Sequence, residues 1–139
     1  MESLALIIEN HTSSYLTANY TGAYNILKKF SIEDFELPAI AIGIGKLDEY
    51  EPDTGVYGGR LSLVILTQID ETSNDLTVHD STTQDVYDLI LSEDFLTYFN
   101  NQANGHLWSI YDVSLENDRQ DRILVSIIEL SLYAQIMAV

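Results

Sequence analysis

The sequence predicts an α+β fold in which a mixed or antiparallel sheet of about four to five strands is packed by an N-terminal helix and a central helix. Three observations support this prediction. Apolar residues recur at spacings of three and four near the start, two strand-like apolar segments follow, and two more close the chain. At 139 residues the chain has the size of one domain, so we assign residues 1–139 to a single unit with its own core.

The first apolar pattern predicts a helix from about residue 2 to residue 19. Side chains spaced three and four positions apart share one face of a helix, and Gly22 follows as the end of this region. The residues of the apolar face are Leu4, Ile7, Ile8, His11 and Tyr15.

Two strand patterns follow, and an acidic segment separates them. In residues 37–46 (LPAIAIGIGK) isoleucines alternate with small residues, and the run RLSLVILTQI from Arg60 has apolar side chains on both faces. Residues 48–59 (DEYEPDTGVYGG) are rich in carboxylates and turn formers, so they form either a long excursion or the tip of a hairpin. Residues 70–75 are expected to be a polar loop.

The second half predicts one helix and one long hairpin. Ser81 or Thr82 can cap a helix that runs to about residue 101, and Ser92 marks a place where this helix can bend. Strand patterns from His106 and Asp121 then pair as a hairpin.

The last strand predicts a sheet with one buried face. Its apolar and polar side chains point in opposite directions, so the second face is wet or lies against a partner. Its length of about fourteen residues exceeds the usual five or six, which requires a bulge or an end that reaches past the body. The apolar set is Ile128, Leu130, Leu132 and Ala134, and the other set is Glu129, Ser131, Tyr133 and Gln135.

Composition and charge exclude several classes of function. The chain carries 22 Asp and Glu against 6 Lys and Arg, a formal net charge of -16, so it lacks the basic patch that binding to duplex DNA or to an anionic membrane surface requires. The absence of cysteine removes disulfides and thiolate metal sites. The first residues lack the basic region of a signal peptide, and no apolar stretch approaches the roughly 18 residues of a membrane-spanning helix. Taken alone, these features predict a cytoplasmic protein.

No group of residues matches a known catalytic or cofactor-binding motif, so we predict a protein that is not an enzyme and uses no cofactor or metal. A G-x-S-x-G nucleophile turn is absent, and residues 43–46 (GIGK) lack the earlier glycine of a phosphate loop. The three histidines are far apart in sequence, and we expect the nearest ligand pair, His79 and Asp80, to lie in a solvated loop. The carboxylates of residues 49–53 miss the EF-hand spacing, which favours a solvated acidic loop over a cation site.

Four features recur in a recognisable order along the chain. They are the LPAIAI run from Leu37, the Gly58-Gly59 entry into the Arg60 strand, the Thr82 helix, and a C-terminal strand pair around Asp112 and Ile128. This order resembles that of the tail terminator and tail-completion proteins of long-tailed bacteriophages. The resemblance spans about residues 37–135 and, more loosely, the N-terminal helix. The long last strand and the acidic segment depart from the family pattern.

This resemblance implies a structural virion protein that forms a ring, commonly of six subunits, at the head-proximal end of the tail tube. There it would stop tail polymerisation and join the tail to the neck, with DNA passing through its lumen. The implied partners are further copies of the chain, the tail tube protein and a neck or head-closure protein, with no membrane partner and with assembly in the host cytoplasm. Two alternatives stay open: a neck or head-closure protein at the same joint, and a small module that binds a peptide or a cation.

Within such a ring, carboxylates and tyrosines are the candidate site residues. A carboxylate-lined lumen repels phosphates, so DNA slides through it, and an exposed strand edge is a template for the next subunit. We expect some of the carboxylates to face the channel or a neighbouring subunit, the alternative being that they are merely solvated. The lumen or interface candidates are Asp48, Glu49, Glu51, Asp53, Asp70 and Glu71, and the inter-subunit contact candidates are Tyr57, Tyr111 and Tyr133.

Overall fold

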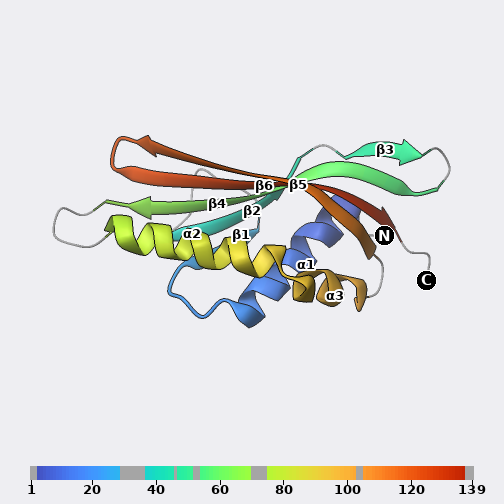
Figure 1. The fold of residues 1–139 in the computed structure, drawn as a ribbon, viewed down its shortest axis with the longest axis horizontal. Coiled ribbons are helices and arrows are strands. Elements are labelled where there is room, and N and C mark those ends of the chain that lie inside the picture. Colours follow the sequence, from blue (N-terminus) through green and yellow to red (C-terminus); the bar gives the residue numbers. More distant parts are fainter. Residues whose placement is uncertain are drawn as a thin grey trace.

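A computed structural model describes residues 3–28, 37–45, 47–51, 54–69, 75–102 and 105–136 of the chain. The helices cover one face of a long sheet, so the molecule has two layers (Figure 1). The elements in chain order are α1 (Leu4–Asn19), β1 (Asn25–Lys28), β2 (Ala39–Ile44), β3 (Asp48–Glu51), β4 (Val56–Gln68), α2 (Asp75–Leu91), α3 (Glu93–Asn100), β5 (Gly105–Gln120) and β6 (Ile123–Ile136).

In the described part of the chain, six strands form one mixed sheet in the order β1-β2-β4-β6-β5, with β3 paired to the first part of β4. β1 runs parallel to β2, and the other neighbouring pairs are antiparallel. β4 and β6 pair without a register shift from Val56↔Gln135 to Gln68↔Ile123. The two long strands β4 and β6 therefore form the backbone of the sheet.

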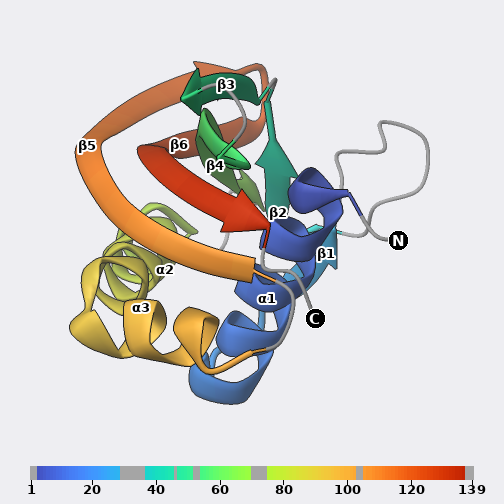
Figure 2. The same ribbon diagram turned by 90° about the vertical axis from the view of Figure 1, so that its right-hand side faces the viewer.

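β5 follows β6 along one edge of the sheet and curves strongly (Figure 2). Its pairing with β6 has two register shifts, one between Leu107 and Ser109 and one between Ile110 and Asp112. Extra residues of this kind bend a strand and increase its twist, which accounts for the curvature. The bulge that the length of the last strand predicts is thus absent from β6, and the irregularities lie in its partner β5.

The alternation along β6 is the one that the sequence predicts. Every second side chain is buried against the helical layer, and those between them lie on the outer face with partial exposure. β4 has the same alternation, because Leu61 and Leu63 lie directly across from Leu130 and Ile128. The buried side chains of β6 are Ser126, Ile128, Leu130, Leu132 and Ala134.

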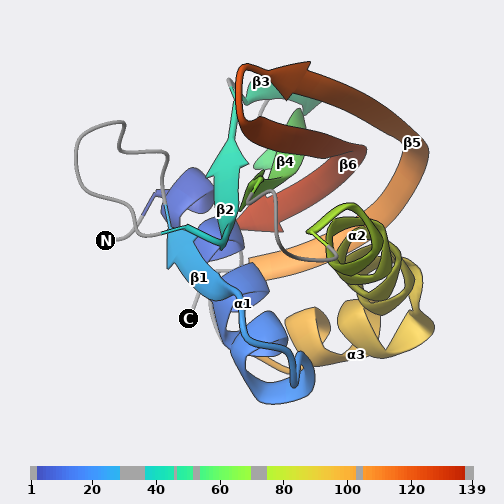
Figure 3. The ribbon, with the colours of Figure 1, turned by 90° about the vertical axis from the view of Figure 1, so that its left-hand side faces the viewer.

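The helices complete the core from below the sheet, as Figure 3 shows from the other end of the molecule. Ser3 caps α1, and its hydroxyl oxygen accepts a hydrogen bond from the Leu6 N–H at 3.2 Å. Ser92 separates α2 from α3, and its hydroxyl donates to the Leu89 carbonyl at 2.9 Å, so the predicted bend is a break between two helices. None of the described helices is both long and apolar enough to span a membrane.

The predicted fold class, an α+β domain with an N-terminal and a central helix on a sheet, is confirmed. Two short strands, β1 and β3, raise the strand number above the predicted four to five. The acidic segment is the tip of a hairpin rather than a long excursion, since β3 pairs with β4. The central helix begins at Asp75, earlier than predicted, because its first two turns carry an exposed face of Leu76 and Val78 that weakens the periodic signal.

Two leucines, each in a helix, differ in how far their side chains are buried. Leu16 of α1 is 0% exposed, whereas Leu76 of α2 is 62% exposed. We expect Leu16→Ala to lower the free energy of unfolding by about 2–5 kcal/mol, because it removes buried methyl groups and leaves a cavity. Leu76→Ala should change it by less than about 0.5 kcal/mol. Urea unfolding followed by circular dichroism measures both, and equal effects would contradict this assignment of the core.

Candidate functional site

Two features gather polar or aromatic side chains from distant parts of the chain. The first is a buried series of hydrogen bonds around His79, inside the helix–sheet interface. The second is a group of tyrosines on the outer face of the sheet, which the helices leave uncovered. Their burial decides which of them can meet a ligand or a partner.

The buried series connects strands β4, β5 and β6, helix α2 and the residue before β1 through one histidine. The Tyr24 hydroxyl lies 2.6 Å from Thr67 Oγ1, which lies 2.6 Å from His79 Nδ1. On the other side of the ring, His79 Nε2 lies 2.7 Å from Ser126 Oγ, which donates to Asn117 Oδ1 at 2.6 Å. Because the Ser126 proton points to Asn117, Ser126 accepts from Nε2–H, and the neutral ring accepts from Thr67 at Nδ1.

The Ser126–His79 pair has the spacing of a nucleophile and its base but lacks their chemistry. A nucleophile must reach its substrate and give its proton to the base. Ser126 is 0% exposed and donates its proton away from the histidine. Burial lowers the pKa of His79 below its usual 6.5, with the Asp80 carboxylate acting in the opposite direction. The histidine therefore serves as a neutral link that fixes α2 on the sheet.

The expectation that His79 lies in a solvated loop is wrong. The helix begins at Asp75, so His79 falls on its buried face together with Thr82, Thr83 and Val86. The signal that sequence reasoning missed is the spacing of His79, Thr83 and Val86 at four and three positions. A face that mixes histidine and threonine is buried only because each polar atom finds a partner, and Thr83 donates to the His79 carbonyl at 2.9 Å.

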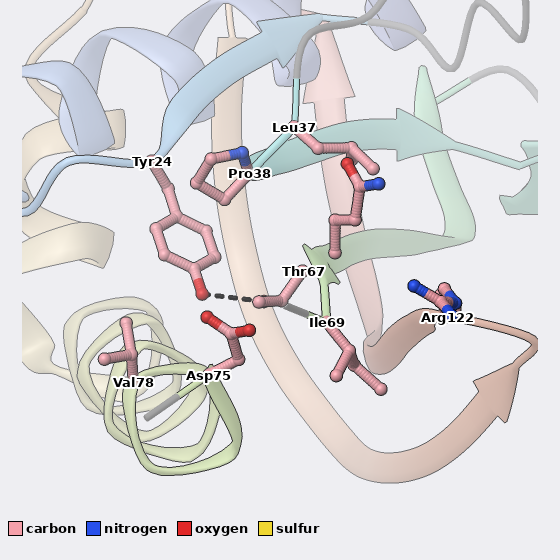
Figure 4. Close-up of a pocket in the computed structure, with 9 residues that line it drawn as sticks. Tyr24, Leu37, Pro38, Thr67, Ile69, Asp75, Val78 and Arg122 are labelled. Atoms are coloured by element: carbon pink, nitrogen blue, oxygen red, sulfur yellow. Dashed lines mark hydrogen bonds between the residues drawn. The ribbon is translucent and has the colours of Figure 1, made fainter. Parts of the chain in front are cut away.

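A pocket of about 470 Å³ lies beside this series at the end of β4 (Figure 4). Tyr24 and Thr67 form part of its wall, and Asp75 and Arg122 add one acid and one base. Burial raises the pKa of the Tyr24 hydroxyl above its usual 10, so this group stays a protonated donor. Over the described ranges, no three His, Cys, Asp or Glu side chains lie close enough together to hold a metal ion.

The outer face of the sheet carries what we call the tyrosine surface, formed by Tyr50 of β3, Tyr111 of β5 and Tyr133 of β6. The Tyr133 ring lies centrally, with its centroid 4.4 Å from that of Tyr50 and 4.7 Å from that of Tyr111, to which it is nearly parallel at 21°. Tyr50 and Tyr111 are each 57% exposed. Three aromatic rings from three strands therefore form a continuous patch that faces solvent.

Two bulges place the outer rings of this patch. Tyr50 lies at the register shift between Glu49 and Glu51, and Tyr111 lies at the shift between Ile110 and Asp112. A bulge re-aims a side chain that regular alternation would send elsewhere. The central ring is accommodated by Gly58, directly across on β4, where an added Cβ would lie only 3.2 Å from Tyr133 Cε1.

Next to the tyrosine surface is a depression of about 500 Å³ whose lining includes Asp48, Glu49, Tyr50, Arg60 and Tyr111. Arg60 is engaged across the sheet, with its Nη1 3.3 Å from Glu129 Oε1. Asp48 and Glu49 are exposed and bring two carboxylates to the edge of the aromatic patch. The depression thus combines π faces with negative charge.

The structure brings only some of the predicted site residues together. Tyr111 and Tyr133 lie together on the tyrosine surface, and Asp48 and Glu49 line the adjoining depression. Tyr57 is partly buried against the core, on the face opposite Tyr133. Glu51 lies in β3. The remaining carboxylates, Asp53, Asp70 and Glu71, lie outside the described residues.

Tyr50 is the member of the surface that sequence reasoning missed. It lies in a segment whose carboxylates and turn formers favour a loop, and a four-residue strand gives too short an alternation to detect.

Burial and the neighbouring Tyr111 and Tyr50 hydroxyls raise the pKa of Tyr133 above its usual 10, so its ring stays neutral.

The fold has a counterpart among solved structures. No protein-family model and no curated protein matches the chain. A chain from the structure of a "virion of native gene transfer agent (GTA) particle" has a similar fold, with a TM-score of 0.62 and 11% sequence identity. The match covers 99% of this chain and 100% of that one. The likeness therefore extends over the whole α+β unit and establishes a shared fold.

The buried histidine predicts how stability changes with pH. Since the folded pKa of His79 lies below the usual 6.5, acidification through about 6.5 protonates the unfolded chain first. The free energy of unfolding should therefore fall as pH drops from 7.5 to 5.5, and His79→Gln should remove this part of the slope. Urea titrations at several pH values measure it.

Val86→Ala is the matched control for this titration, because it weakens the same buried face of α2 and retains the histidine. It should be less stable at every pH yet keep the wild-type slope. A wild-type slope in His79→Gln would show that His79 does not contribute.

Proposed function

We propose that this chain is a structural protein of a phage-like virion particle. The observation that carries the proposal is the fold match to a chain of a gene transfer agent virion, which leaves almost no part of either chain unmatched. Because the match covers almost the whole of both chains, it favours two proteins with similar roles over two unrelated proteins that share only a common substructure. The uncovered tyrosine surface supports it, since exposed aromatic patches on small domains mark protein–protein contacts.

Within the particle, we assign the chain to a ring at the head-proximal end of the tail tube, which ends tube polymerisation and joins the tail to the neck. Charge supports this position, because DNA must pass through the lumen without being held. A net charge of -16 creates a field that repels phosphates over the Debye length of about 8 Å at physiological salt. Asp48 and Glu49 are exposed and available to line the lumen or a subunit contact.

Removal of the gene from the cell that produces the particle tests the assignment to the tail. A ring that ends polymerisation limits the length of the tube, so its loss should give tubes longer than those of the wild type and heads without tails. Negative-stain electron microscopy of the lysate measures tube length, and the wild-type gene supplied on a plasmid should restore it. Tails of normal length joined to heads would contradict the role.

The tyrosine surface predicts which substitution prevents incorporation into the particle. Tyr111 is exposed, so Tyr111→Ser should leave folding intact while removing a large aromatic contact area. A loss of about 1.4 kcal/mol or more at an assembly contact lowers binding about tenfold. We expect purified particles to contain correspondingly less of the variant chain, as measured by quantitative immunoblotting.

Leu76→Ser is the control, since it also replaces an exposed apolar side chain but on α2, on the helical side of the sheet. It should be incorporated like the wild type. Equal incorporation of both variants would exclude the tyrosine surface as an assembly contact. The position of the chain in the virion would then be tested by the gene deletion alone.

A further inference from the structure

The long sheet has two unlike ends, and their chemistry is complementary. At one end lies the depression beside the tyrosine surface, and at the other lies the turn between β5 and β6 (Figure 1). We define this turn and its flanks, residues 119–122, as the hairpin tip. We propose that the hairpin tip of one copy of the chain docks in the depression of a second copy. This inference rests on the proposed ring and names the partner of the tyrosine surface.

The depression has the features of a guanidinium site. Tyr50 and Tyr111 present exposed rings, and a guanidinium within about 6 Å of such a ring is attracted by its π face. Asp48 and Glu49 supply carboxylates that can accept paired N–H donors. Arg60, which also lines the depression, already has a partner within the same molecule, because its Nη1 lies 3.3 Å from Glu129 Oε1.

The hairpin tip supplies cations in a chain that has few of them. Arg119 and Arg122 are two of six Lys and Arg residues, and both side chains are exposed. The tip is a tight turn in which Asp121 adopts a left-handed φ of 55°. Arg119 is ordered at both ends of its stem: its N–H donates to Asp118 Oδ1 at 2.7 Å, and its Nε donates to the Asp121 carbonyl at 3.3 Å. A preordered arginine loses less side-chain entropy when it binds.

The two sites of one molecule cannot meet. Tyr133 and Ile123 are ten positions apart along β6, which at about 3.3 Å per residue separates them by about 33 Å. A tip must therefore reach the depression of another copy. Contacts between two depressions would bring carboxylates together. The tip carries two arginines and one aspartate, so contacts between two tips would bring a net positive charge together, and like-with-like pairing is disfavoured.

A contact between unlike surfaces is heterologous, and repetition of it produces a ring or an open helix instead of a closed two-fold dimer. This is the symmetry that a ring protein needs. The proposed contact thus gives the tip of the β5–β6 hairpin the role of propagating the ring.

Disulfide trapping tests the contact directly, because the chain has no cysteine of its own. Purified full-length Gln120→Cys is mixed with Glu49→Cys under mild oxidation, and the mixed dimer is quantified by non-reducing electrophoresis. The matched control replaces Glu49→Cys with Gln84→Cys, an exposed position on α2. We expect the tip–depression pair to cross-link about tenfold faster than the control pair, and equal rates would overturn the proposal.

A second experiment reverses the charges on the two sides of the proposed contact. Adding Arg119→Glu to the tip copy should lower the cross-linking rate to that of the control, and Asp48→Lys in the other copy should restore it. Loss of rate without recovery by the exchanged pair would overturn the assigned ion pairing. Trapping that fails while the wild-type chain remains at the head–tail joint would refute the contact alone, whereas trapping without incorporation into particles would refute the virion role alone.

Discussion

The pairing of β4 with β6 is the constraint on which the rest of the structure depends. The two strands stay in register over their whole length. Every second residue of β6 from Ser126 to Ala134 is buried, and so are Leu61, Leu63 and Ile65 of β4. A slip by one residue would send Leu130 and Leu132 to solvent and Glu129 and Ser131 into the core, so the register is strongly specified. Because it is fixed, the same pairing decides which side chains face outward, and the outer surface is set by the packing of the inner one.

Polar contacts determine the position of α2 on the sheet, which apolar burial alone does not. The leucines and isoleucines of the sheet would accept a helix in several positions, whereas the His79 ring needs Thr67 on one side and Ser126 on the other. A shift of α2 by one turn would leave these buried groups without partners, at a cost of about 1–3 kcal/mol for each. The buried series is thus an argument for a single position of α2, and its lack of exposure explains why it is structural.

The sequence predicts most of the fold, because its long elements carry strong periodic signals. α1, the helical region around Ser92 and the β5–β6 hairpin are each long enough for alternation or helical spacing to stand out. β1 and β3 have four residues each and draw their stability from β2 and β4, so their formation depends on tertiary pairing. The prediction for His79 was wrong for a related reason. A polar residue is stable on the buried face of a helix because of hydrogen-bond partners that are distant in sequence, here Thr67 and Ser126.

The members of the tyrosine surface could be predicted only in part. Tyr111 and Tyr133 were among the predicted contact residues, whereas Tyr50 was missed. Tyr50 and Tyr111 lie at register shifts, which change the direction of a side chain without leaving a sequence period. The bulge at Tyr111 also contributes to the curvature of β5, and therefore to the direction in which the hairpin tip points. In the proposed contact between copies, this one irregularity would affect both the tyrosine surface and the direction of the hairpin tip. The angle between successive copies of a heterologous assembly decides between a closed ring and an open helix, so in such an assembly the bulges would help to set its architecture.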